Sequence, residues 1–190
     1  MSTFGEKQLI APVPALAGPS ARLFLTSATI LFVELLLIRW IPANVVYVGF
    51  FSNFLLIASF LGIGLGIILG RRGTGPAVSP FTLLLFGLVV LALGAQLNVN
   101  VASDDQIFFG LAESTSADTN FIVLPFLMAF VVALMTTLAL PLGSMLRSLP
   151  PLRAYATDIA GSLAGIAGFG LVSALGLEPI VWFSVTAVLL

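Results

Sequence analysis

The sequence contains no cysteine and no histidine among its 190 residues. Without them the chain cannot form disulfides, thiol nucleophiles, zinc clusters, histidine-ligated haem or imidazole proton relays. Charge is scarce as well, because Lys, Arg, Asp and Glu make up only 8% of the residues. A soluble domain of this length needs far more charged surface than that. These shortages exclude an ordinary soluble protein.

Apolar residues are correspondingly abundant: 59% of the chain is hydrophobic and its mean hydropathy is +1.19. A bilayer core about 30 Å thick needs roughly 20 apolar residues of helix, and runs of that length recur. The fold class predicted is all-α, a polytopic transmembrane helical bundle. Five complete spans are expected at 23–41, 45–69, 81–97, 121–145 and 154–175, followed by an incomplete sixth at 179–190.

The chain divides into a flexible cytoplasmic tail, residues 1–21, and a transmembrane domain, residues 22–190. The tail does not resemble a cleaved signal peptide, because the first apolar run is too long and lacks a small-residue cleavage site. Pro42 is expected to close the first span. The sequence is still apolar at Leu190, so we expect it to be part of a longer protein.

Basic residues predict the orientation. Cytoplasmic loops of membrane proteins carry an excess of Lys and Arg. With the N-terminus inside, six basic residues fall on the cytoplasmic side and the acidic segment 98–120 falls outside; the six are Lys7, Arg22, Arg71, Arg72, Arg147 and Arg153. The membrane expected is a bacterial-type inner membrane.

Glu34 and Arg39 lie inside the first apolar run. A charged side chain at that depth normally faces protein or water and has a partner. A separation of five residues turns a helix by about 140°, so these two do not share a face well. Glu34 is therefore expected to be protonated or to meet a polar group on another helix, such as Asn53. It is either a proton- or cation-binding carboxylate or a packing contact, and the packing interpretation is favoured.

Glycines recur at helical spacing near the end of the second span. Gly62, Gly66 and Gly70 fall on one helix face, where they allow a neighbouring backbone to approach closely. The run does not fit a dinucleotide-binding fingerprint, because the spacing is wrong and no strand precedes it. We interpret it as a packing surface.

The fifth span repeats this pattern. Gly161 and Gly165 form one small-residue face, and Ala160, Ala164 and Gly168 form an adjoining one. A helix with two such faces is expected at the centre of a bundle rather than against lipid.

Tyr155 and Asp158 lie one turn apart near the cytoplasmic start of the same span. An acidic residue in the first turn interacts favourably with the helix dipole. That structural role is favoured for Asp158, and a catalytic role is the alternative.

Several segments resemble the membrane region of spermidine synthase-like proteins. Residues 34–39 (ELLLIR) and 60–66 (FLGIGLG), the latter followed by a basic pair, resemble its first two helices. Residues 152–165 (LRAYATDIAGSLAG) resemble its fifth helix, and residues 175–183 (LGLEPIVWF) continue the likeness. Glu34, Arg39, Tyr155 and Asp158 fall on recurrent polar positions of that region.

In that family the membrane region precedes a cytosolic Rossmann-like aminopropyltransferase domain. The resemblance implies a parent protein linked to polyamine synthesis, in which this module anchors the catalytic domain and feeds it substrate. The nucleotide-binding segment of the family has no counterpart in this sequence, so we assign no catalytic residue, cofactor or metal.

The expected partners are the lipid bilayer and other membrane helices or a cytosolic domain, and not nucleic acid. Two other functions remain open: a non-catalytic structural subunit of a larger membrane complex, and a small transporter. The transporter is disfavoured because the sequence shows no clear inverted repeat.

Overall fold

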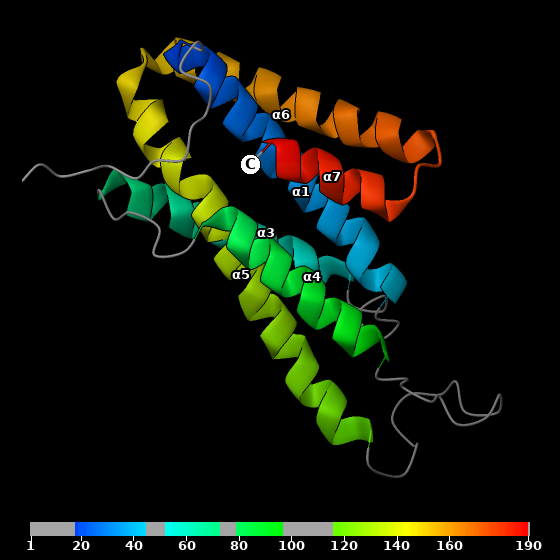
Figure 1. Ribbon diagram of the computed structural model, residues 1–190. Helices are drawn as coiled ribbons and strands as arrows, with labels where there is room; N and C mark the ends of the chain where they lie inside the picture. Colours follow the sequence, from blue (N-terminus) through cyan, green and yellow to red (C-terminus); the bar gives the residue numbers. More distant parts are fainter. Residues whose placement is uncertain (1–17, 45–51, 73–78, 97–115, 190) are drawn as a thin grey trace, which may run out of the picture.

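The computed structural model describes residues 18–44, 52–72, 79–96 and 116–189, and in these segments the regular elements are helices only (Figure 1). The helices are α1 (Pro19–Asn44), α3 (Ser52–Arg71), α4 (Pro80–Gln96), α5 (Ser116–Ser148), α6 (Pro151–Ala174) and α7 (Pro179–Leu189). Four of them, α1, α3, α5 and α6, are long and apolar enough to cross a membrane. The all-α membrane architecture expected from the sequence is therefore confirmed.

The predicted number of spans is only partly matched. The described part of α4 has 17 residues and α7 has 11, whereas a span needs about 20. The complete span predicted at 81–97 therefore stays a prediction. Most of the predicted tail 1–21, namely residues 1–17, and most of the acidic segment 98–120, namely residues 98–115, lie outside the described residues. The end of the predicted tail is not flexible, because α1 begins at Pro19.

Prolines mark the ends of the helices less sharply than expected. The prediction that Pro42 closes the first span is wrong, because α1 begins at Pro19 and continues through Pro42 to Asn44. A proline ring fits the first turn of a helix, where its missing N–H is not needed, and in the last turn it costs only one backbone hydrogen bond. In α5, Pro125 and Pro141 likewise lie inside the helix.

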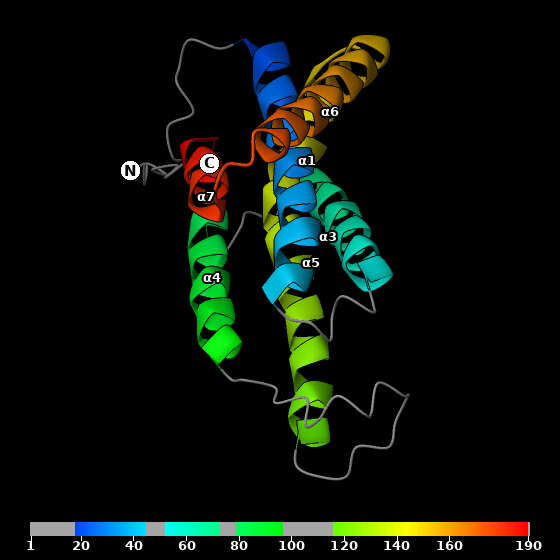
Figure 2. The same ribbon diagram turned by 90° about the vertical axis from the view of Figure 1, so that its right-hand side faces the viewer.

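The helices form two closely packed pairs, α1 with α6 and α3 with α5, and these pairs have the most extensive contacts (Figure 1). The two members of each pair run in the same direction, as the order of their glycine contacts along both helices shows. α5 also contacts α1 and so joins the pairs. α4 packs on α5, and α7 turns back beside α1 after Gly176, whose φ of 65° is one that glycine adopts without strain (Figure 2).

Glycines bring α3 and α5 into backbone contact. A Cβ atom added to Gly62 would lie 2.6 Å from the Cβ of Met135, and one added to Gly66 would lie 2.7 Å from the Cβ of Ala139. Gly70 faces the backbone of Leu140 in the same way. α5 contributes a glycine of its own, Gly143, which faces the carbonyl oxygen of Ile67. No larger residue fits these positions without moving the helices apart.

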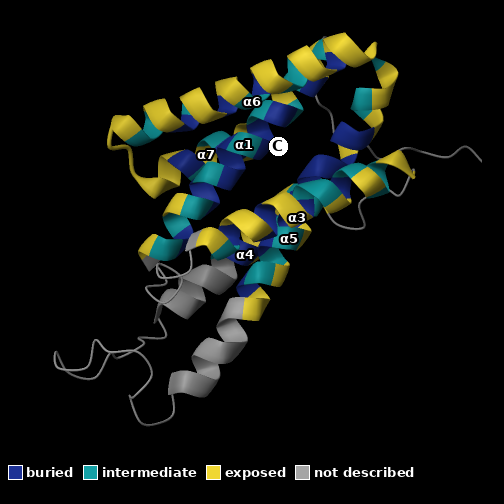
Figure 3. Ribbon diagram, turned by 180° about the vertical axis from the view of Figure 1, so that it is seen from behind, coloured by how far each residue is buried: buried dark blue, intermediate teal, exposed yellow. Residues whose placement is uncertain are grey.

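The exposed faces of the helices, yellow in Figure 3, carry many large apolar side chains. On α3, Ile57 and Phe60 are 55% and 60% exposed, and on α6 Leu163 and Leu171 are 61% and 63% exposed. Soluble proteins rarely expose so many large apolar side chains together. In a bilayer these side chains contact lipid tails, so the free-energy cost of exposing them to water disappears. These faces therefore show that the chain belongs in a bilayer.

We predict that Gly66→Ala destabilises the protein by about 1–3 kcal/mol, because the added methyl group overlaps the backbone of α5. Gly64→Ala is the matched control, since a Cβ there would meet nothing within 4 Å. Alanine at that position should be neutral or stabilising by up to about 1 kcal/mol, given its higher helix propensity. Unfolding in mixed micelles measures both variants, and equal stabilities would contradict the packing described above.

Candidate functional site

Two of the polar residues singled out in the sequence, Arg39 and Asp158, lie at the interface between α1 and α6. Two glycines of α6 set its width: Gly161 lies against the carbonyl group of Phe24, and Gly165 lies against the backbone of Ala28. A Cβ atom at Gly161 would also come within 3.0 Å of the Cβ of Ser27. This close approach brings side chains far apart in the sequence into contact at both ends of the interface.

At the end of the interface near the start of both helices, Ser27 donates a hydrogen bond to Asp158. Its Oγ lies 2.5 Å from Oδ1 of Asp158 and 3.0 Å from the carbonyl oxygen of Leu23. The hydroxyl has a single hydrogen, and the carboxylate is the stronger acceptor because a charged partner strengthens a hydrogen bond. Ser27 is only 1% exposed, so this bond is shielded from water.

Asp158 does not lie in the first turn of its helix. α6 begins at Pro151, three residues earlier than predicted, and its first turn contains no acidic residue. Seven residues correspond to about two turns, which places Asp158 about 10 Å from the start of the helix. The helix-dipole interpretation of Asp158 is therefore wrong, because the favourable effect is confined to the first turn. The partner of its carboxylate is a serine of α1.

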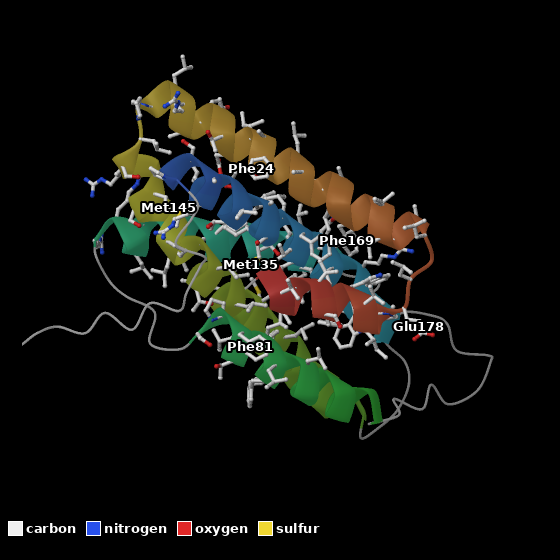
Figure 4. The ribbon with its side chains drawn as sticks, turned by 45° about the horizontal axis from the view of Figure 1, so that its top comes forward. Phe24, Phe81, Met135, Met145, Phe169 and Glu178 are labelled. Carbon is white, nitrogen blue, oxygen red and sulfur yellow. The ribbon has the colours of Figure 1, made fainter. Side chains whose placement is uncertain are left out.

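At the opposite end of the interface, Arg39 joins α1 to α6 and α7. Its guanidinium group donates a hydrogen bond to the hydroxyl of Ser173, and its Cζ lies 5.5 Å from the ring centre of Trp182. The Trp182 ring meets Phe169 edge to face at 5.5 Å, and Phe169 meets Phe32 in the same way. Figure 4 shows Phe169 on α6 turned towards α1. An arginine held over an indole face is a favourable cation–π contact.

Glu34 and Asn53 are not brought together. Glu34 is 4% exposed, whereas Asn53 is exposed at the start of α3. Within the described part of the chain, no hydrogen bond or ion pair joins Glu34 to Asn53 or Arg39. Arg39 is exposed and Glu34 is buried, which agrees with the different faces that their spacing gives them.

The prediction that α6 is central is wrong. Only Ala154, Gly161, Gly165 and Phe169 of this helix are buried, and its outer face is exposed (Figure 3). The predicted second packing face is largely open, because Ala160 and Ala164 are exposed and a Cβ at Gly168 would make only an ordinary contact, 3.9 Å from Phe32. Tyr155 is exposed as well. Small residues permit close packing, but they do not supply a partner.

These groups are suited to binding rather than to covalent chemistry. Asp158 is half-buried, and within the described residues only its Oδ1 accepts a hydrogen bond, which leaves Oδ2 available to a cation. No cluster of three His, Cys, Asp or Glu side chains that could hold a metal occurs in the described residues. The interface therefore presents a carboxylate oxygen at one end and a guanidinium group at the other.

Sequence reasoning missed Ser27, Ser173 and Trp182. The sequence did hold one indication that Ser27 belongs to a polar site. It precedes Glu34 by seven residues, which places both side chains on the same face of the helix, two turns apart. Its contact with Asp158 spans 131 positions of the sequence, and no local pattern reveals it.

Comparison of the chain with protein-family models, with curated proteins and with solved structures finds no match. The geometry of the interface is therefore the basis for a functional assignment.

We predict that Ser27 and Asp158 are energetically coupled. Hydrogen bonds between membrane helices average about 0.6 kcal/mol, and those to charged groups in proteins reach about 1.5–3 kcal/mol, so we expect a coupling of roughly 1 kcal/mol or more. A double-mutant cycle of Ser27→Ala and Asp158→Ala, with unfolding measured in micelles, gives this value. Ser184→Ala paired with Asp158→Ala is the control, because the Ser184 hydroxyl bonds only to its own helix, at the carbonyl oxygen of Ile180. Additive effects of Ser27→Ala and Asp158→Ala would contradict the hydrogen bond.

Proposed function

We propose that this chain is an integral membrane module like that of spermidine synthase-like proteins. It anchors an aminopropyltransferase-like catalytic domain at the cytoplasmic face of the membrane and holds a cationic substrate near that domain. The module itself performs no covalent chemistry, and its contribution is position and binding.

One observation carries the proposal: three of the sequence segments that resemble the family lie together. Residues 34–39 belong to α1, residues 152–165 to α6, and residues 175–183 to the turn after α6 and to α7. Arg39 of the first segment lies over Trp182 of the third. Asp158 of the second segment bonds to α1. Residues that share a function are expected to converge in this way, whereas unrelated likenesses would be scattered over the bundle.

The basic residues support a cytoplasmic location for the ends of α3 and α5 and the starts of α1 and α6. Arg22, Arg71, Arg147 and Arg153 all belong to these ends, and Arg147 donates a hydrogen bond to the carbonyl oxygen of Arg71 at 3.0 Å. Positive charge concentrated at one end of a helical bundle marks the cytoplasmic side in bacterial inner membranes. We place the N-terminus there as well.

Two carboxyl groups support a cationic substrate. Asp158 has a free carboxylate oxygen at the cytoplasmic end, and Glu34 lies deeper in α1. Acidic side chains inside a span are commonly part of ion or substrate pathways. A polyamine offers ammonium groups, which donate hydrogen bonds to carboxylates and carry the opposite charge.

A second function, a structural subunit of a membrane complex, draws support from α6. Ala156, Ala160 and Ala164 form an exposed row one turn apart on this helix. Small residues at this spacing let another membrane helix approach.

Co-purification tests the proposed function. We expect the tagged full chain, extracted from the membranes of its host, to carry with it an activity that transfers aminopropyl groups from decarboxylated S-adenosylmethionine to putrescine. Release of methylthioadenosine measures this activity. Gly165→Leu should lower it because the larger side chain separates α6 from α1. Gly170→Leu is the matched control, since a Cβ there meets nothing within 4 Å.

If the chain instead purifies with stoichiometric membrane partners and without transfer activity, the proposal is wrong and the structural-subunit function is favoured. Equal activity in the two leucine variants would show that the α1–α6 interface has no part in the function.

A further inference from the structure

A cavity opens between the start of α1 and the end of α5, away from the α1–α6 interface. Its volume is about 400 Å³, and it is lined by Pro19, Arg22, Ser144, Met145 and Ser148. Small-molecule sites commonly occupy cavities of roughly 300–1,000 Å³. This one is therefore large enough for a small polar group.

The helix contacts place the cavity at the membrane surface. Met145 lines it and accepts a hydrogen bond from Thr26, one turn further along α1 than Arg22, with 3.7 Å between Oγ1 and Sδ. Beyond that contact, α1 has its first residue at Pro19 and α5 has its last residue at Ser148. Figure 4 shows Met145 at this end of the bundle. The ends of spanning helices lie among the lipid headgroups, so the cavity is at headgroup depth.

The chemistry of the lining favours an anion. Arg22 supplies a fixed positive charge with several N–H donors, and none of the five lining residues is acidic. The hydroxyls of Ser144 and Ser148 now donate to carbonyl groups of their own helix, at 2.9 and 2.8 Å, and can rotate towards a ligand. Arg147 and Arg71 belong to the same end of the bundle and add positive potential.

We propose that this cavity binds a phosphate-bearing anion, in which Arg22 contacts the phosphate oxygens. Guanidinium groups bind phosphate through paired, charge-assisted hydrogen bonds, and the two serine hydroxyls add further contacts. Two sources offer a phosphate group to this cavity. Anionic phospholipid offers one at headgroup depth, and free phosphate offers one from the aqueous side. The inference is independent of the proposed function.

Lipid binding to the full chain in nanodiscs tests the site. Native mass spectrometry measures how much phosphatidylglycerol, relative to phosphatidylcholine, stays bound to the protein. We expect Arg22→Gln to lower that ratio about tenfold or more, since Arg22 loses charge-assisted hydrogen bonds in addition to its general attraction to an anionic surface. Arg153→Gln is the matched control, because Arg153 is exposed at the start of α6 and does not line the cavity.

A second measurement separates the two sources of phosphate and checks that the variants fold. Thermal unfolding is recorded in phosphatidylcholine nanodiscs with inorganic phosphate or with chloride at equal ionic strength. Stabilisation by phosphate in the Arg153→Gln protein but not in the Arg22→Gln protein identifies a site that also takes the free anion. Lipid selectivity without that stabilisation identifies the headgroup as the ligand. Equal lipid ratios in the two variants, with no effect of phosphate, would overturn the proposal.

Discussion

Close contact between helix backbones is the constraint on which this structure depends. In a bilayer an apolar side chain gains little by leaving lipid for a neighbouring helix, so packing and polar contacts must hold the helices together. Here glycines provide that contact in both helix pairs. Gly62 and Gly66 allow α3 to pack closely on α5. Gly161 and Gly165 allow α6 to pack closely on α1. Because large apolar side chains cover much of the rest of the surface, these narrow glycine strips decide which helices pair.

The same constraint places the polar residues. Once Gly165 lies against Ala28, the Ser27 and Asp158 side chains are close enough to bond, and further along the interface Arg39 reaches Ser173 and the Trp182 ring. A partly buried carboxylate and an arginine are costly in lipid unless they have such partners. The α1–α6 interface thus serves two purposes: it joins two helices, and it partly buries Asp158, which we propose to bind a cationic substrate. The cavity at Arg22 lies outside this interface, and its basic lining suits an anion rather than a cation.

The sequence predicted the kind of structure well because composition and hydropathy act over whole helices. The runs around Val33, Leu65 and Leu134 are apolar over most of their length, and they form helices long and apolar enough to cross a membrane. Glycine spacing also identified residues that face a partner. It did not identify the partner, since Gly62 and Gly161 each mark a face but carry no information about which helix lies opposite. The centrality of α6 was mispredicted for this reason.

Local sequence patterns also gave wrong helix ends, and with them a wrong position of Asp158 within its helix. Pro42 is expected from the sequence to end the first span, yet it lies inside α1, and α6 begins at Pro151, earlier than expected. Starting α6 at Pro151 moves Asp158 three residues, nearly one turn, deeper than expected. The partners Ser27 and Ser173 come from positions more than 130 residues away from Asp158 and Arg39, so only the fold brings them together.

Cysteine labelling tests the central claim most directly, which is that α1 and α6 cross the membrane side by side in the same direction. The chain has no cysteine, so single substitutions need no background removal. Ser20 lies at the start of α1, Ser148 just before α6, and Glu178 just after it. With a membrane-impermeant maleimide, we expect Glu178→Cys to react in intact cells, and Ser20→Cys and Ser148→Cys to react only after permeabilisation. Reaction of Ser148→Cys and Glu178→Cys from the same side would contradict the account, because α6 would then not cross the bilayer.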